Sequence, residues 1–381
     1  MTGAEALARL RGAYDDRLGE AARRKAAGSI LVGYFLNAVP VELIAAAGLD
    51  PIRLVGDPAR SVATADRYME EYFDGEVRAI FSALVEGDMA MLDLLVVPRT
   101  AEIYLQLYYF LREIPKWEPD AKLPPVHLWD FLQTQRFTTA KYDLGRLRDL
   151  AERLVAAGGT RVDDAALAEA IGQANRLRGA LIAVSDFWHG ETRRLSGSDA
   201  LRVIGAASVL PPGEAVAVLE ALVADPPAPL PEAGPRLLLK GSPQHDTRFC
   251  DLVESCGAAV VAHDHIAGDR TFTAPVATDG DPWEALVHHY QSNVPGPRAY
   301  PQAREDAAFL ALAQRARVDG VVFFHDEWDD TLGWEYPDQK ALLDAAGIPS
   351  LFLKRQPYLD PPEDAQRAAV TAFVASIGKA A

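Results

Sequence analysis

The sequence predicts an α/β fold made of two parallel-sheet lobes with a helical segment between them. In the first and last thirds of the chain, short apolar runs alternate with amphipathic segments, which is typical of strands and helices around a parallel sheet. In the middle of the chain the strand pattern disappears. A length of 381 residues also exceeds what one ordinary hydrophobic core holds. We therefore expect two Rossmann-like (flavodoxin-like) lobes.

The first lobe is expected to span residues 1–137 and to begin with an Ala- and Arg-rich helix over 3–27. Its expected strands are apolar throughout, as strands buried on both faces are. They are placed at 29–35, 52–56, 91–98 and 124–131, with helices at 41–49 and 102–113.

A helical region over 138–224 and a Pro-rich linker over 225–235 are expected to follow. The second lobe, residues 236–381, repeats the plan of the first without a visible sequence repeat. Its strands are expected at 236–242, 258–264, 320–326 and 349–355, and its helices near 246–256, 303–316, 336–346 and 362–377.

Composition and charge exclude several classes of protein. A net charge of −16 disfavours nucleic acid and anionic membranes as partners. No apolar run approaches the roughly 18 residues that span a bilayer, and the charged N-terminus does not look like a signal peptide, so we expect a cytoplasmic protein. The two cysteines, Cys250 and Cys256, form neither a disulfide framework nor a CxxC metal site.

Ligands of open parallel sheets bind beyond the carboxyl ends of the strands, which points to the loops after each strand. The most polar of these loops, 325–335, sets His325 beside several carboxylates. It could bind a divalent metal or perform acid–base chemistry, or it could be a solvated loop that caps the next helix. His263 and His265 are expected to face the same side of a strand. They could form a two-histidine metal site, or they could be structural residues. The chain has no GxGxxG, Walker A or GxSxG motif.

Several of these loops resemble a known family. The segments GYFLNAVPVELIAAAGLDPIRLVG (33–56), VVPRTAEIYLQLYYFLRE (96–113) and DGVVFFHDEWDDTLGWEYPDQKALLDAAGIPSLFLK (319–354) are similar to the 2-hydroxyacyl-CoA dehydratase and benzoyl-CoA reductase family. The similarity covers nearly the whole chain, and the length resembles that of the smaller, beta-type subunit. The resemblance implies a heterodimer of related chains, an acyl-CoA substrate and an ATP-dependent activator that supplies an electron.

The resemblance also implies a [4Fe-4S] cluster bound by cysteines, whose thiolates suit iron. The corresponding positions here read Leu36, Ala101 and Asp329, and the family's Pro-Cys-Pro element reads Pro295, Gly296 and Pro297. Leucine and alanine cannot ligate iron. We therefore expect no cofactor in this chain and a [4Fe-4S] cluster in a homologous partner subunit, on which the activator would act.

Three functional hypotheses follow, and the preferred one is a clusterless subunit that supports a cluster-bearing partner. The aromatic segment 104–111 of this subunit would either contact the partner or pack in the hydrophobic core. The second hypothesis is a repurposed non-redox enzyme, and the third is an acyl-CoA-binding protein that needs basic residues against the acidic background. The acyl group stays open, as does the choice between dehydration and ring reduction.

The loops provide three sets of candidate residues. The candidate catalytic residues are Asn37, Glu102, His325, Glu327 and Asp329. The candidate substrate-binding residues are Pro40, Glu42, Thr100, Gly241, Ser242 and Arg270, and the basic residues near the loops are Arg99, Lys240, Arg270 and Lys354.

Overall fold

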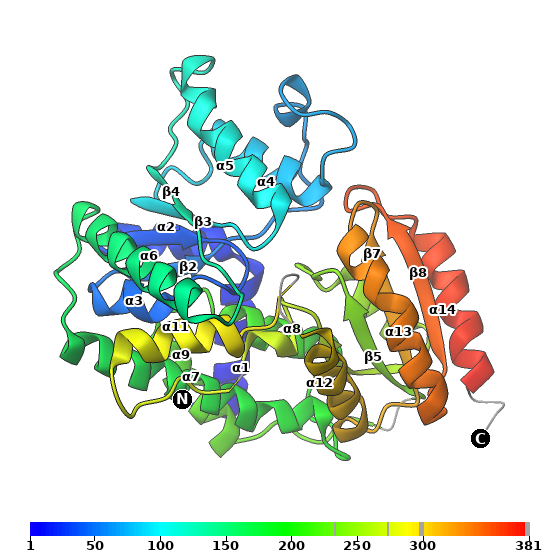
Figure 1. Ribbon diagram of the computed structural model, residues 1–381. Helices are drawn as coiled ribbons and strands as arrows, with labels where there is room; N and C mark the ends of the chain where they lie inside the picture. The colour runs from blue at the N-terminus through cyan, green and yellow to red at the C-terminus, as the bar shows by residue number, and fades with distance from the viewer. Residues whose placement is uncertain (232–233, 273, 297–300, 378–381) are drawn as a thin grey trace.

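The computed structural model, which describes residues 1–231, 234–272, 274–296 and 301–377, confirms the expected fold class (Figure 1). Each lobe contains a four-stranded sheet in which all pairs of strands are parallel. The first sheet has the order β2-β1-β3-β4 and the second the order β6-β5-β7-β8, so both lobes share one topology. The first sheet consists of β1 (Leu31–Tyr34), β2 (Asp50–Arg53), β3 (Leu94–Pro98) and β4 (Val126–Trp129), and the second of β5 (Arg236–Gly241), β6 (Ala259–Asp264), β7 (Gly320–Asp326) and β8 (Ser350–Gln356).

The central strands β1 and β3 of the first sheet are buried along their whole length because both faces of this sheet are covered. In β1, Leu31 belongs to one core cluster of the first lobe, whereas Val32 and Tyr34 belong to another on the opposite face. The helices of this lobe are α3 (Val41–Ala46), α4 (Gly75–Glu86) and α5 (Glu102–Glu113). Helix α4 was not expected from the sequence, although Asp74 caps its start by accepting a hydrogen bond from the Val77 backbone N–H.

The single helix expected over 3–27 is wrong, because the chain forms α1 (Gly3–Asp15) and α2 (Arg17–Ala26). Asp16 leaves the helical conformation, and its side chain accepts a hydrogen bond from the Gly19 backbone N–H at the start of α2. The helical region contains α6 (Phe137–Ala156), α7 (Asp164–His189), α8 (Gly197–Ala206) and α9 (Pro212–Ala224), as expected. Residues of α1 share one core cluster with residues of α7, α8 and α9.

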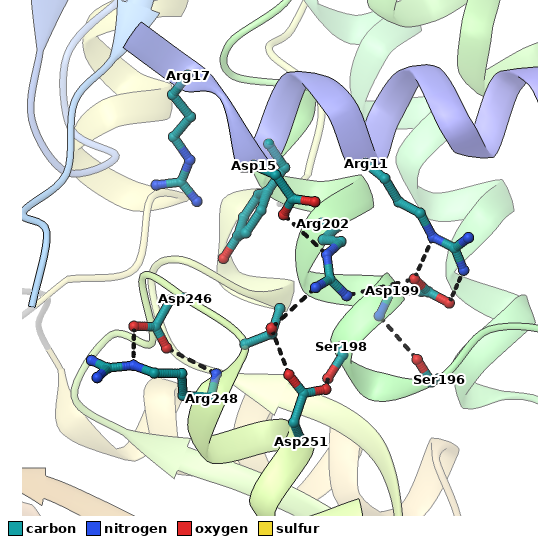
Figure 2. Close-up of polar contacts among 12 residues, drawn as sticks. Arg11, Asp15, Arg17, Ser196, Ser198, Asp199, Arg202, Asp246, Arg248 and Asp251 are labelled. Atoms are coloured by element: carbon teal, nitrogen blue, oxygen red, sulfur yellow. Dashed lines mark hydrogen bonds and ion pairs between the residues drawn. The ribbon is translucent and has the colours of Figure 1, made fainter. Parts of the chain in front are cut away.

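A polar network fastens α1 to α8 and to the segment that leads into α10 (Arg248–Ser255) (Figure 2). Arg11 donates two hydrogen bonds to Asp199, at 2.8 and 2.7 Å. Arg202 lies between the elements and donates to Asp15 (3.1 Å) and to the Thr247 hydroxyl (3.3 Å). These contacts connect the N-terminal helix and the helical region to the second lobe.

The remaining helices of the second lobe are α11 (Pro282–Ser292), α12 (Gln302–Arg315), α13 (Asp330–Ala346) and α14 (Glu363–Ile377). The helix expected from residue 336 begins six residues earlier, at Asp330. Asp329 caps it, and Pro337 lies inside it rather than at its start. Short 3₁₀ turns occur at Ala65–Arg67, Ile114–Lys116 and Asp269–Thr271. None of the described helices combines the length and the apolar character needed to cross a bilayer.

Candidate functional site

A pocket of about 360 Å³ lies between the two lobes, where loops after strands of both sheets meet. Leu36 follows β1, Ala101 follows β3 and Asp329 follows β7, and all three line this pocket together with Gly296. These are four positions that the family resemblance assigns to cysteines. The structure therefore brings them together from distant parts of the chain, while Pro297 of the same element lies outside the described residues.

The side chains at these positions do not fit a [4Fe-4S] cluster. Leucine, alanine and glycine offer no ligand atom, so only the Asp329 carboxylate could bind a metal. Neither cysteine is placed to replace them: Cys250 is buried in the core of the second lobe, and Cys256 lies at the end of α10 beside Thr371. Among the residues that the structure describes, no three His, Cys, Asp or Glu side chains are grouped to hold a metal ion.

Three aspartates gather in the pocket, and their mutual repulsion adds to the effect of burial. Asp74, Asp326 and Asp329 all line it. Burial and the nearby Glu76 raise the pKa of Asp74 to about 7, and burial and Asp74 raise the pKa of Asp326 well above its ordinary value. Burial also raises the pKa of Asp329. A carboxyl group that titrates near pH 7, as Asp74 does, can donate a hydrogen bond to a ligand while it is protonated.

Ser242, a candidate substrate-binding residue, is not among the pocket's lining residues and contacts Asp329. Its hydroxyl donates to the Asp329 carboxylate (2.9 Å) and accepts from the Asp326 backbone N–H (2.9 Å). Gly241 does line the pocket, with a backbone φ of +127°. A Cβ atom there would lie 2.1 Å from the Phe324 carbonyl oxygen, so only glycine fits.

The basic residues near the pocket are already paired with carboxylates. Lys240 and Arg270 line the pocket, and both bind Asp264, at 2.7 Å from the Lys240 Nζ and 2.6 Å from the Arg270 Nε. Arg270 also donates to Glu305 (3.0 Å). The two cations hold the pKa of the buried Asp264 carboxyl far below its ordinary value. Arg99 likewise pairs with Asp130 (2.9 Å).

Most of the other candidate catalytic residues lie outside this pocket. Glu102 lines it, whereas Asn37 lines an adjoining cavity and donates a hydrogen bond to the Pro295 carbonyl oxygen (2.9 Å). His325 and Glu327 are not among the pocket's lining residues.

His325 is buried in an aromatic cluster with Phe323, Tyr336 and Phe352. Burial lowers its pKa to about 4, so the ring is neutral near pH 7. Neighbouring residues of a strand point to opposite faces, which sends Asp326 to the pocket and His325 away from it. The structure therefore places His325 apart from the carboxyl groups that line the pocket.

Pro40 and Glu42 also lie outside the pocket, at the start of α3. Glu42 is buried, forms an ion pair with Arg178 and accepts a hydrogen bond from the Tyr290 hydroxyl (2.9 Å). Thr100 is buried, and its hydroxyl has no hydrogen-bond partner within the described ranges. These contacts connect Glu42 to α7 and α11, and a substrate contact of Glu42 stays a prediction.

His263 in β6 and His265 just after it have different surroundings. The His263 Nε2 lies 2.9 Å from the Gly197 carbonyl oxygen, which gives this ring a structural partner. His265 lines the pocket, and neither of its ring nitrogens has a partner in the described part of the chain. Sequence reasoning missed Asp74 as a site residue because α4 was missed. The aspartate before the glycine and glutamate that begin α4 was the available signal.

Comparison with protein families shows where the chain belongs. The family model described as 2-hydroxyglutaryl-CoA dehydratase, D-component, matches residues 37–377. The chain belongs to this family. Among curated proteins, it is similar to the (R)-phenyllactyl-CoA dehydratase beta subunit of Clostridium sporogenes, with 22% identity over 145 residues. That match covers 38% of this chain and 38% of the relative.

Proposed function

We propose that this chain is a clusterless subunit of an acyl-CoA dehydratase or reductase complex. One observation carries the proposal: the positions assigned to cysteines line a single pocket and offer one ligating side chain, Asp329. A cluster needs several thiolates, and the two cysteines of the chain lie elsewhere. The redox step would then belong to a homologous, cluster-bearing partner in the cytoplasm, reduced there by an ATP-dependent activator.

Membership of a dehydratase-component family and the beta-subunit name of the relative support a partner chain. Exposed aromatic residues near the pocket could contribute to an interface: Tyr72 and Trp328 line the pocket, and Trp334 on α13 is 85% exposed. The aromatic segment 104–111 is mainly core, since Tyr104 and Leu107 are buried, although Tyr109 is exposed.

The first test is anaerobic purification of the tagged full chain from its native host, with partner identification by mass spectrometry and iron analysis of each separated subunit. We expect a stoichiometric, cysteine-bearing homologue that carries all the iron. A homo-oligomer without that homologue, or iron bound to this chain, contradicts the proposal.

A reconstitution experiment tests the pocket directly. The wild-type chain, incubated anaerobically with iron, sulfide and thiol, is expected to bind no cluster after desalting. The triple variant Leu36→Cys, Ala101→Cys and Asp329→Cys restores three thiols to one pocket and is expected to gain iron, sulfide and visible absorption. A matched control introduces three cysteines at exposed positions and should stay colourless. Cluster formation in the wild type contradicts the proposal.

A second candidate function is favoured by the three pocket aspartates with raised pKa values. A carboxylic acid that titrates near neutral pH, as Asp74 does, suits general acid–base catalysis on a bound acyl-CoA without redox chemistry, and burial raises the pKa values of Asp326 and Asp329 as well. This candidate predicts turnover by the isolated, iron-free chain and its loss in Asp329→Asn. If only the complex turns over, and Asp329→Asn leaves its kcat unchanged, this candidate is excluded.

A further inference from the structure

The two lobes are joined in two different ways. The first is a shared core: α11, from the second half of the chain, packs in one hydrophobic cluster with β1 and β3 of the first lobe. The second is a set of side-chain contacts at the start of α4, where the loop after β8 reaches the first lobe (Figure 1). Contacts between a few side chains can break while both lobes stay folded, as happens when domains open about a hinge.

The polar part of this second connection joins Glu76 of α4 to His245 in the loop after β5. The His245 Nε2 atom lies 2.8 Å from the Glu76 Oε1 atom, and the two side chains are only 3% and 13% exposed. Burial raises the pKa of the Glu76 carboxyl, but His245 and weaker neighbours in the first lobe lower it to below its ordinary value. Glu76 is therefore ionised near neutral pH, and its strongest partner comes from the other lobe.

The backbone of His245 is held in place by the N-terminal helices. Its carbonyl oxygen accepts hydrogen bonds from the Tyr14 hydroxyl (3.0 Å) and from the Arg17 guanidinium (3.1 Å). Helix α1 is in turn fastened to α8 and to the segment before α10 (Figure 2). The imidazole is therefore presented to Glu76 from a fixed position on the second lobe.

The packing part of the connection is Tyr358, in the loop after β8. A Cβ atom at Gly75, the first residue of α4, would lie 2.9 Å from the Tyr358 Cβ, and one at Gly56 would lie 2.6 Å from the Tyr358 hydroxyl oxygen. The tyrosine thus fits against the first lobe because both residues are glycines. Its hydroxyl is buried without a hydrogen-bond partner among the described residues. Contact with the first lobe therefore leaves a polar group unsatisfied, and water would satisfy it if the lobes parted.

These contacts lie at one wall of the inter-lobe pocket. Glu76 lines the pocket itself. Pro243 and Asp326 line both this pocket and a smaller cavity of about 50 Å³, which His245 and Tyr358 border. Separation of the contacts would join the two spaces and widen the pocket.

We propose that the Glu76–His245 pair and Tyr358 form a latch, which closes the inter-lobe pocket on this side and whose release lets the lobes part about their shared core. None of the latch residues is a position assigned to a cysteine. The latch does not depend on whether the chain works as a clusterless subunit.

The reactivity of a thiol in the pocket wall tests the latch in the full chain. Leu36→Cys, at a pocket residue that is 6% exposed, supplies the reporter thiol, and Cys256→Ser removes the more exposed native thiol. The buried Cys250 is kept as an internal control for global unfolding. A bulky maleimide should modify the reporter faster when the pocket is open, and mass spectrometry follows both thiols.

Two variants of this reporter chain open the latch by different means. His245→Phe leaves the buried Glu76 carboxylate without its donor, which favours entry of water. Gly75→Leu places a side chain against Tyr358 and removes no polar group. Each should raise the modification rate of the reporter at least tenfold, with the control thiol unmodified. Gly145→Leu is the matched control and should leave the rate unchanged, because a Cβ atom at this glycine of α6 meets nothing within 4 Å.

An unchanged rate in Gly75→Leu, or in His245→Phe that is folded by circular dichroism, overturns the proposal. If His245→Phe does not fold, Gly75→Leu decides the test, since it keeps every polar contact of the latch. Equal acceleration in Gly145→Leu also overturns the proposal. So does modification of Cys250 at the same rate as the reporter, because it shows unfolding of the second lobe rather than opening of the latch.

Discussion

Asp74→Asn should make the protein more stable at neutral pH, although it removes a capping carboxylate. The pKa of Asp74 is about 7 in the folded protein, against 3.8 ordinarily, and a shift of this size corresponds to about 4 kcal/mol at most. The side chain is partly exposed, so solvent screening reduces this to about 2 kcal/mol. Asparagine caps a helix as well as aspartate does, so the hydrogen bond to the Val77 N–H should persist.

The pH dependence gives the sharper test. Above pH 3.8 the unfolded chain ionises at Asp74, whereas the folded chain keeps the proton up to about pH 7. The wild type therefore has its full stability from this group below pH 3.8 and loses it as the pH rises through 7. The advantage of Asp74→Asn should be about 2 kcal/mol at pH 8 and less than half of that at pH 5.

Urea unfolding at pH 5 and pH 8, followed by circular dichroism, measures this difference. Asp279→Asn replaces an exposed aspartate and should change stability little at either pH. An advantage of Asp74→Asn that is equal at both pH values, or larger at pH 5, refutes the argument that the pocket keeps this carboxyl protonated.

Four further predictions concern other parts of the structure. Asp264→Asn leaves two buried cations without their shared carboxylate and should lower the free energy of unfolding by about 3–5 kcal/mol in urea. Gly241→Ala places a Cβ against backbone at positive φ and should cost more than about 1 kcal/mol, with a lower melting temperature. The pKa of His325 is about 4 in the folded protein, so the free energy of unfolding of the wild type decreases as the pH falls below 6.5. His325→Phe cannot take up this proton. In urea unfolding at pH 5, its free energy of unfolding should therefore decrease by about 1–2 kcal/mol less than that of the wild type. A thiol reagent should modify Cys256 in the native protein but Cys250 only after unfolding, because Cys250 is buried and burial raises its pKa. Mass spectrometry counts the modified thiols, and modification of both in the native protein contradicts this prediction.

The strands were predictable from sequence because the physical signal is strong. Most of them overlap a continuous apolar run, and the parallel sheets with covered faces explain why those runs do not alternate. The exception is β2 (Asp50–Arg53), which begins two residues before the strand expected at 52–56 and contains Asp50 and Arg53. The boundaries of the helices were harder to predict from the sequence. The break at Asp16 depends on one residue leaving the helical conformation inside a sequence that is otherwise helical throughout. The early start of α13 depends on the cap at Asp329.

The location of the pocket could be predicted from the sequence, but the contacts between its side chains could not. The rule that ligands bind beyond the carboxyl ends of parallel strands selected loops that do line the pocket. It could not show that Lys240 and Arg270 are neutralised by Asp264, or that Glu42 pairs with Arg178, 136 residues away. Such pairings depend on which helices meet in the folded chain.

The pocket's shape is held by contacts that need no bound cluster. Leu36, at the first of the positions assigned to cysteines, has a φ of +60°, a conformation that costs a non-glycine residue about 1 kcal/mol or more. The loop that follows it is fastened on two sides: Asn37 donates to the Pro295 carbonyl oxygen (2.9 Å), and the buried Trp129 indole N–H donates to the Ala38 carbonyl oxygen (2.8 Å). Because these bonds and the burial of Leu36 fix the loop, the inter-lobe pocket keeps its form with a leucine where the family resemblance expects a thiolate. The pocket therefore needs no thiolate at this position to keep its form.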